Sequence, residues 1–266
     1  MLASVSFDWS VVLWDSPDFH EKYRLFGHNA PVVTAAFLPE GRFLATGGDD
    51  FLALIWDMTA IRAGADPAPI ARFAHQRKIS HLSISADSAM LAIASWDGGL
   101  QIWSLDTMTP ITKCRRHIGP VQPTQFVENG AQIISAGRDG HIRRWNLKEK
   151  HYVQSLVENG WDINVMHVNR NLSFIAFGGA QGAMRIISLD DREIAVTLTG
   201  GLDPVLAIKY HPNSQKLAFG TASGRIVIAD RAHSTVISDF KATNGPVWGL
   251  AFLSHTASLV FAGLDD

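Results

Sequence analysis

The sequence predicts an all-β fold built from repeats of one four-stranded antiparallel unit. Three observations predict it. A His precedes a Trp by 28 residues in three places, an Asp lies six residues before each of those Trp residues, and the residue that opens each unit recurs after 42 or 47 residues. Repeats near this length, with four short strands each, are typical of the blades of a β-propeller.

The repeat frame extends through nearly the whole chain. Its successive steps are 47, 42, 42, 42 and 42 residues, and the units open at His28, His75, His117, Asn159, Gly201 and Thr243. The longer step contains the extra segment Ala60–Pro69, which is rich in Ala, Gly and Pro. Such a composition predicts an exposed loop inserted ahead of the next unit.

Each unit begins with an apolar strand, which a polar turn connects to a second strand rich in small residues. First strands are expected at Val32–Phe37, Ile79–Ile84, Val121–Phe126, Ile163–Val168, Val205–Tyr210 and Val247–Phe252. Second strands are expected at Phe43–Thr46, Leu91–Ala94, Gln132–Ala136, Phe174–Phe177, Lys216–Phe219 and Ser258–Phe261. Third strands are clearest at Leu100–Trp103 and Ile142–Trp145, and fourth strands at Ile70–Phe73 and Val153–Val157. No segment shows the periodicity of a helix of three turns.

Both ends of the chain fall inside a unit. Met1 stands where a second strand should begin, and Asp266 stands just after the turn that follows a second strand. The frame therefore contains seven repeat registers, of which the first and the last are incomplete. Two interpretations fit: six closed blades, with strands from both termini completing one blade, or a truncated seven-bladed ring, which we favour. In either case we expect residues 1–266 to form a single propeller domain that is truncated at both ends.

The composition excludes several classes of site. The net charge is −2 with no clustered basic surface, which gives no reason to expect nucleic-acid binding. The single cysteine, Cys114, excludes an intrachain disulfide and a Cys-based zinc site. The 11 His residues show no metal-ligand spacing, and no apolar run reaches the length of a membrane span. We therefore expect no cofactor, no metal and no membrane span.

The recurring residues resemble the WD-repeat (WD40) family. In that family a His, a Ser or Thr, an Asp and a Trp form a hydrogen-bonded network inside each blade, since Trp donates one hydrogen bond, His can donate and accept, and Asp orients the imidazole. The matching positions are His28, Thr46, Asp50 and Trp56; His117, Ser135, Asp139 and Trp145; His75, Asp97 and Trp103, with Ile93 at the hydroxyl position; and Ser4, Asp8 and Trp14 in the first fragment. A hydrolase triad is the competing interpretation of Ser, His and Asp, but these sets recur and the chain has no G-x-S-x-G elbow.

The pattern weakens in the units that open at Asn159 and Gly201. These units carry Gln181 and Ser223 at the Asp position, and Ile187 and Ala229 at the Trp position. We expect both blades to be held by apolar burial alone, which a propeller tolerates because each blade packs mainly on its neighbours.

The Trp residues outside the network predict a surface. Four Trp residues remain, at positions 9, 96, 161 and 248. Trp96 and Arg138 each precede the Asp of the turn, a position that in WD-repeat proteins points to one rim and often contacts partners, while Trp161 and Trp248 open first strands. Exposed Trp and Arg are typical interface anchors. We predict a partner-binding rim formed by Trp96, Arg138, Trp161 and Trp248, and a protein–protein interaction scaffold that is not an enzyme.

A narrower resemblance gives an alternative. The strings SFDWSVVLWD, GGDDF, ASWDG, ENGWDINV, GPVWGLAF and GLDD are similar to bacterial WD40 proteins fused to a c-type cytochrome domain. That resemblance implies a redox or electron-transfer protein in the periplasm, whereas an ordinary WD40 scaffold would be cytoplasmic. The chain has no CxxCH, so haem binding is carried onto no residue. A propeller enzyme is a third interpretation, which would need titratable residues that converge in space.

Overall fold

The structure is a computed structural model of the chain. It describes residues 1–15, 18, 20–38, 41–158, 160–169, 171, 173–190, 194–199, 203–212, 215–252 and 258–263. The described residues form strands, with one short α-helix and one 3-10 turn. They divide into two compact units. Unit 1 is Met1–Ser135 and Arg144–Val153, and unit 2 is Ala136–Arg143 and Gln154–Asp266.

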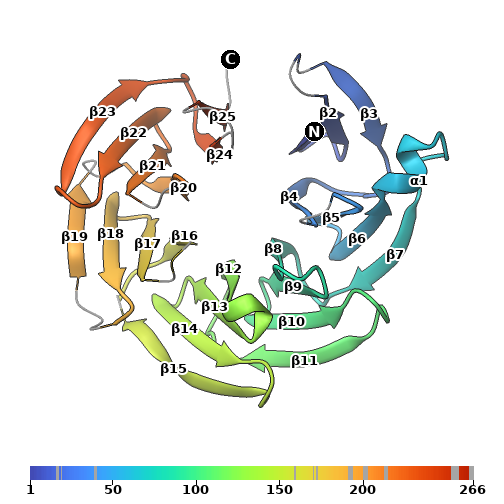
Figure 1. Cartoon of the computed structure of the whole chain (residues 1–266), viewed down its shortest axis with the longest axis horizontal. Coiled ribbons are helices and arrows are strands. Elements are labelled where there is room, and N and C mark those ends of the chain that lie inside the picture. The colour runs from blue at the N-terminus through green and yellow to red at the C-terminus, as the bar shows by residue number, and fades with distance from the viewer. Residues whose placement is uncertain are drawn as a thin grey trace. The chain divides into compact units, whose positions relative to one another are not determined.

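Unit 1 begins with a three-stranded sheet, which two four-stranded sheets follow. The order in each antiparallel sheet is the order along the chain (Figure 1). The first sheet contains β1 (Leu2–Val5), β2 (Val11–Trp14) and β3 (Glu21–Leu25). The next two contain β4 (Val32–Phe37), β5 (Phe43–Gly48), β6 (Leu52–Asp57) and β7 (Pro69–Ala74), then β8 (Ile79–Ile84), β9 (Met90–Ser95), β10 (Gly99–Ser104) and β11 (Pro110–Arg115).

The next sheet contains the boundary between the units, and unit 2 continues with three more sheets. The boundary sheet has β12 (Val121–Val127), β13 (Gln132–Gly137), β14 (His141–Asn146) and β15 (His151–Glu158), with the 3-10 turn η1 (Glu128–Gly130) after β12. Unit 2 has β16 (Ile163–Val168), β17 (Phe174–Gly179), β18 (Ala183–Ser188) and β19 (Ile194–Thr199), then β20 (Val205–Tyr210), β21 (Lys216–Thr221), β22 (Arg225–Asp230) and β23 (Thr235–Lys241), and finally the pair β24 (Val247–Phe252) and β25 (Leu259–Gly263).

The predicted fold class is confirmed: the chain is all-β, and its sheets are antiparallel propeller blades. Five of the described sheets have four strands, the first has three and the last has two, as the positions of Met1 and Asp266 in the frame predicted. The predicted first strands agree with β4, β8, β16, β20 and β24 at both ends, and β12 is one residue longer. The opening positions Asn159 and Gly201, and the final segment 264–266, lie outside the described residues. The choice between six closed blades and a truncated seven-bladed ring stays a prediction.

The segment expected as an exposed loop is exposed over residues 62–68, whereas its first residues form part of a helix. It overlaps a short helix, α1 (Met58–Arg62), whose N-cap Asp57 accepts hydrogen bonds from the backbone N–H groups of Thr59 and Ala60 at 2.8 and 3.1 Å. Met58 and Ile61 are buried in the core, so the start of this connection packs against the sheets. A helix of five residues is too short to produce a periodic apolar pattern, which explains why the sequence did not reveal it.

The blades pack face to face through small residues near the end of each second strand. A Cβ added to Gly47 on β5 would lie 2.7 Å from Ile79 on β8, and a Cβ added to Gly220 on β21 would lie 2.5 Å from Val247 on β24. These distances are too short for any side chain. The small residues that marked the second strands therefore allow the first strand of the next blade to approach closely.

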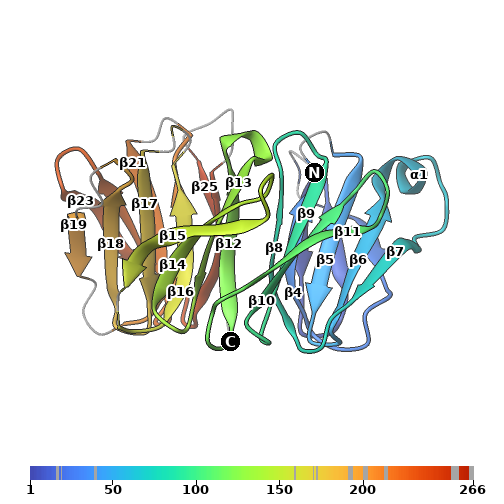
Figure 2. The same cartoon turned by 90° about the horizontal axis from the view of Figure 1, so that it is seen from below.

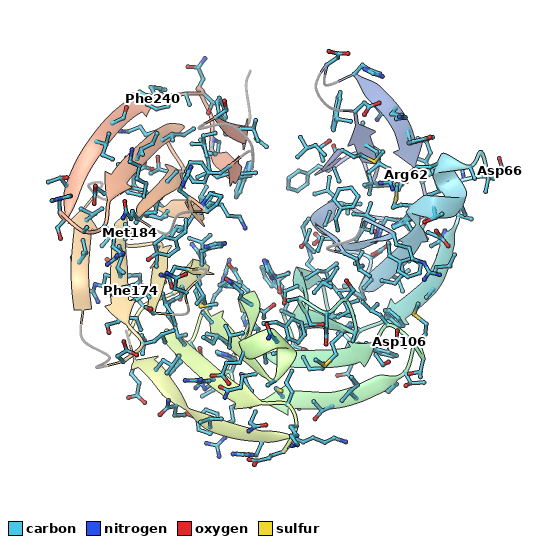
Figure 3. All side chains as sticks on the ribbon, in the orientation of Figure 1. Arg62, Asp66, Asp106, Phe174, Met184 and Phe240 are labelled. Atoms are coloured by element: carbon cyan, nitrogen blue, oxygen red, sulfur yellow. The ribbon has the colours of Figure 1, made fainter. Side chains whose placement is uncertain are left out.

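Each unit has its own apolar core between neighbouring sheets. In unit 1, Leu13 and Leu25 pack with Leu44 and Trp56, so the first sheet covers one face of the second. In unit 2, Met184 packs with Val205, Phe219 and neighbouring residues (Figure 3). Phe240, also labelled in Figure 3, lies on the last strand β23 and is exposed. No described helix is long and apolar enough to cross a membrane.

Candidate functional site: blade turns and an exposed aromatic edge

The blade β4–β7 contains a complete network of the expected residues. The Trp56 indole N–H donates to Thr46 Oγ1 at 2.9 Å, and Thr46 Oγ1 lies 2.8 Å from His28 Nε2. His28 Nδ1 lies 2.9 Å from Asp50 Oδ2, and Asp50 Oδ1 accepts from the backbone N–H of Leu52 at 3.1 Å. Every group is satisfied when the imidazole is neutral, accepts from Thr46 and donates to Asp50. Burial lowers the pKa of His28, which favours this neutral form.

The blade β12–β15 keeps the same hydroxyl position. Ser135 Oγ accepts from the Trp145 indole N–H at 2.8 Å and lies 2.8 Å from His117 Nε2. Asp139 Oδ2 additionally accepts from Arg143 at 2.6 Å, and the Arg143 side chain is buried. The sequence reasoning did not include Arg143. The signal for it was an Arg two residues before the Trp, where the blade β4–β7 has a leucine.

The blade β8–β11 has the network residues without their hydroxyl. Ile93 stands at that position and is fully buried. The buried His75 Nε2 and the Trp103 indole nitrogen consequently have no hydrogen-bond partner among the described residues. His75 Nδ1 instead lies 3.4 Å from the amide nitrogen of Gln101, and the Trp103 ring stacks on Phe73 with a centroid distance of 4.3 Å. Burial lowers the pKa of His75 to about 4, so the imidazole is neutral at pH 7.

In the blade β20–β23 the expectation of apolar burial alone is wrong. The Ser223 backbone N–H donates to Asp203 Oδ1 at 3.0 Å, and its hydroxyl donates to Asp203 Oδ2. The acid therefore lies before the first strand and the hydroxyl lies in the turn. In the His-containing blades the acid lies in the turn instead. The blade β16–β19 has a different polar contact, because the Arg185 guanidinium lies 5.1 Å from the centroid of Trp161.

The four predicted rim residues differ in their surroundings. In unit 1, Trp96 is 39% exposed, with the Lys78 ammonium 6.0 Å from its ring centroid. In unit 2, Trp248 is 57% exposed, and the exposed Arg138 has its Nε 3.9 Å from Asp162. Trp161 is half-buried beside Phe177, with its ring centroid 6.4 Å away, so much of its surface packs within unit 2.

Unit 1 also exposes large apolar side chains that the sequence reasoning did not select. Figure 2 shows that the strands of each sheet run between two opposite ends, where the connecting segments gather. The turns after second strands and the segments before first strands share one of these ends. The exposed apolar residues of unit 1 at this end, here called the aromatic edge, are Phe7, Trp9, Phe26, Phe51, Trp96 and Ile118. In the sequence, only Trp9, a Trp residue outside the repeat network, pointed to these residues.

Hydrogen bonds connect this end of one blade to the next. The Val32 backbone N–H, at the start of β4, donates to the Ser6 carbonyl oxygen in the β1–β2 turn at 3.1 Å. The Lys78 ammonium, just before β8, bonds to Asp49 in the β5–β6 turn. The His75 backbone N–H also donates to the Phe51 carbonyl oxygen at 2.8 Å. The turns that carry the aromatic edge are therefore joined within unit 1.

Two members of the aromatic edge have an unfavourable backbone conformation. Trp9 and Phe51 each follow the Asp of a turn, with φ angles of 74° and 69°. Left-handed backbone of this kind is costly for bulky residues and favours glycine. The same position holds glycine in four other blades, at Gly98, Gly140, Gly182 and Gly224. Trp9 and Phe51 are half-exposed, so the fold gains little from them in return.

Comparison with known families gives a direct match for part of this frame. Residues 19–57 and 68–104 match the WD domain, G-beta repeat family, WD40. These two segments end one residue past Trp56 and Trp103, the residues that close the repeat frame. The match therefore covers two of the repeat units, and it agrees with the resemblance of these units to WD40 repeats.

Three curated relatives of this chain come from eukaryotes. Pre-mRNA-splicing factor cwf17 of Schizosaccharomyces pombe is 25% identical over 187 residues, which cover 68% of this chain and 52% of the relative. Pre-mRNA-processing factor 19 of Oryza sativa subsp. japonica is 20% identical, with 83% of this chain and 51% of the relative covered. Telomerase protein component 1 of Rattus norvegicus is 31% identical over 54% of this chain and 6% of the relative. The chain therefore spans about half the length of the first and second of these relatives, and far less of the third.

The remaining chemistry of the blades is limited in the part of the chain that the structure describes. No group of three His, Cys, Asp or Glu residues there could hold a metal ion. The Cys114 thiol is buried, and burial raises its pKa to about 12, which makes it a poor nucleophile. The arrangement is suited to presenting side chains at the ends of rigid blades.

Proposed function

We propose that the chain is a non-catalytic WD40 scaffold that binds a protein partner through the aromatic edge of unit 1. The observation that carries the proposal is the pair Trp9 and Phe51. Both are bulky, half-exposed and held at positive φ, at a position that glycine occupies in four other blades. Backbone strain of this kind persists where a side chain serves function rather than stability.

The composition of the edge supports a protein as the partner. Phe7, Phe26 and Ile118 are 72%, 66% and 84% exposed, which is unusual for large apolar side chains. Aromatic residues presented on rigid elements are the typical anchors of protein interfaces, since they bury a large area at a small cost in conformational entropy. The surrounding charges are partly compensated by pairs such as Lys78–Asp49. A partner with an apolar surface would fit this edge.

The predicted rim residues take different roles in the proposal. Trp96 belongs to the aromatic edge of unit 1. In unit 2, Arg138 and Trp248 occupy the corresponding ends of their own blades, and we include them as further partner contacts. Trp161 contributes mainly to packing, because its ring lies beside Phe177 and Arg185.

The experiment replaces strained anchors by the residue that other blades use. A full-length chain with Trp9→Gly and Phe51→Gly is immobilised beside the wild type, and the proteins captured from an extract of the source cells are compared by quantitative mass spectrometry. Phe240→Ser is the matched control, because Phe240 is an exposed aromatic residue of unit 2 outside the edge. The proposal expects the glycine variant to lose proteins that the control retains. Identical captured sets for all three chains would contradict it.

The narrower resemblance to cytochrome-fused proteins supports a second candidate, a propeller belonging to a redox protein. Its support is the set of similar strings in the sequence, and the relatives reported above do not add to it. Sequencing of the flanking coding region tests it, since a CxxCH in the same reading frame is required. Without that motif nearby, this candidate fails.

We further propose that residues 1–266 fold as one cooperative domain. Closely approaching glycines couple neighbouring blades within each unit, as Gly47 does against Ile79 and Gly220 against Val247. Calorimetric unfolding should give one transition whose van't Hoff and calorimetric enthalpies agree. Two separated transitions would instead indicate independent units.

A further inference from the structure

Unit 1 contains a pocket outside the aromatic edge, on the face of the blade β8–β11 that meets the end of β7. Its volume is about 310 Å³. This value is near the lower limit of about 300–1,000 Å³ for small-ligand pockets. Its lining includes His75, Asp97, Gln101, Trp103, Lys113 and Arg115.

Two cations lie side by side along one wall of this pocket. Lys113 is directly opposite Gln101 in the β10–β11 ladder, and Arg115 is opposite Gly99. Both cationic side chains are exposed, and neither forms an ion pair with another described residue. Because Lys113 and Arg115 alternate along β11, they point to the same face of the sheet. The wall therefore carries two charges that no described residue neutralises by direct pairing.

The His75 and Trp103 side chains at the end of the pocket each have a nitrogen that is closed to solvent and lacks a hydrogen-bond partner among the described residues. In the blade β4–β7, Thr46 satisfies both the His and the Trp nitrogens, whereas Ile93 at the same position offers no acceptor. His75 is only 9% exposed, and its Nε2 has no hydrogen-bond partner among the described residues. An amide hydrogen of Gln101 directed at Nδ1 places the imidazole proton on Nε2, so this nitrogen is a donor. The Trp103 indole N–H is a second unused donor.

We propose that this pocket binds a phosphate monoester group. Lys113 and Arg115 supply the charge, the Gln101 amide and the His75 edge form the polar floor, and Trp103 forms the aromatic wall. A phosphate monoester has three acceptor oxygens, which match the Lys113 ammonium, the Arg115 guanidinium and the Gln101 amide better than the two oxygens of a carboxylate do. The site differs from the aromatic edge, so the proposal does not depend on the proposed function.

One acidic group opposes the anion and gives the proposal a sharper test. The Asp97 carboxylate also lines the pocket, and its Oδ1 accepts from the Gly99 backbone N–H at 2.8 Å. Asp97→Asn keeps an oxygen for this turn and removes the negative charge. The variant should bind phosphate more tightly than the wild type, because like charges repel.

The experiment titrates the full-length chain with O-phospho-L-serine, and with a short peptide that contains phosphoserine or unmodified serine. Calorimetry gives the affinity, and the Trp103 indole signal in a ¹⁵N-labelled sample, assigned through Trp103→Phe, reports the location. The double variant Lys113→Gln/Arg115→Gln should weaken binding at least about tenfold, since hydrogen bonds to charged groups are strong. Lys148→Gln removes an exposed cation of unit 1 outside the pocket and should leave the affinity unchanged.

The outcomes separate the two sources of a phosphate monoester. Tighter binding of the phosphopeptide supports a phosphorylated side chain of a partner, and equal or tighter binding of free phosphoserine supports a small phosphorylated molecule. The proposal is overturned if neither phosphorylated probe binds, if the unmodified peptide binds equally well, or if the double variant keeps the wild-type affinity. Folding of each variant is checked by its thermal transition, which exposed substitutions on an edge strand should hardly change.

Discussion

Restoring the missing hydroxyl in the blade β8–β11 should stabilise the protein. Ile93→Thr places a hydroxyl where Thr46 stands in the blade β4–β7, within reach of both nitrogens that have no partner. A buried polar group without a partner costs about 1–3 kcal/mol. Removing one methylene from a buried isoleucine costs about 0.5–1.5 kcal/mol. The net expectation is a gain of about 1–2 kcal/mol in the free energy of unfolding.

Ile93→Val isolates the contribution of the hydroxyl. Valine and threonine have nearly the same shape, so the valine variant shows the loss of the methylene without the new hydrogen bonds. We expect the threonine variant to exceed the valine variant by about 2–4 kcal/mol in the free energy of unfolding. The reverse change, Thr46→Val, should destabilise the protein by a similar amount, because His28 and Trp56 lose their shared partner.

Urea denaturation followed by tryptophan fluorescence measures these differences, with the slope of the transition checked for constancy. A gain of 1 kcal/mol should raise Tm by about 2–4 °C in a chain of this size. The reasoning is refuted if Ile93→Thr is no more stable than Ile93→Val. That result would mean that the two ring nitrogens gain nothing from an acceptor at this position.

Three further predictions concern other parts of the molecule. Phe51→Gly alone should stabilise the fold by about 0.5–1 kcal/mol through relief of the left-handed backbone, and a lower urea midpoint would contradict this. Gly47→Val should destabilise the chain by more than about 3 kcal/mol, because the added Cβ would lie 2.7 Å from Ile79. A variant with wild-type thermal stability would contradict this and show that the two blades can move apart. Folding lowers the pKa of His75 to about 4, from about 6.5 in the unfolded chain. Above the unfolded pKa the imidazole is neutral in both states, and its contribution to the free energy of unfolding is complete. That contribution is lost as the pH falls toward 4, because the unfolded chain takes up the proton first. His75→Gln should therefore flatten stability against pH by up to about 1.4 kcal/mol per pH unit in that window, and an unchanged slope would place the proton uptake elsewhere.

The strand order and the bounds of most first strands could be predicted from the sequence because they depend on local patterns. Apolar runs, small residues and Gly or Asp turns recur at fixed spacing, and each repeat adds evidence for the others. The helix Met58–Arg62 was missed since five residues leave no periodic signal. The Ser223–Asp203 contact was also missed. Ser223 stands at the Asp position of the repeat, but its partner Asp203 matches no position of the expected network, and the order of donor and acceptor is reversed.

The sequence by itself determined the all-β propeller class, the register of each blade, and which residues could form the His–Thr–Asp–Trp network. It also indicated that Ile93 would break one of these networks. Only the tertiary structure decided which side chains are exposed, which placed Trp161 against Phe177 and revealed the strained Trp9 and Phe51. The physical reason is that period and polarity fix the hydrogen-bonded ladder, whereas exposure and pockets depend on how separate turns meet in space.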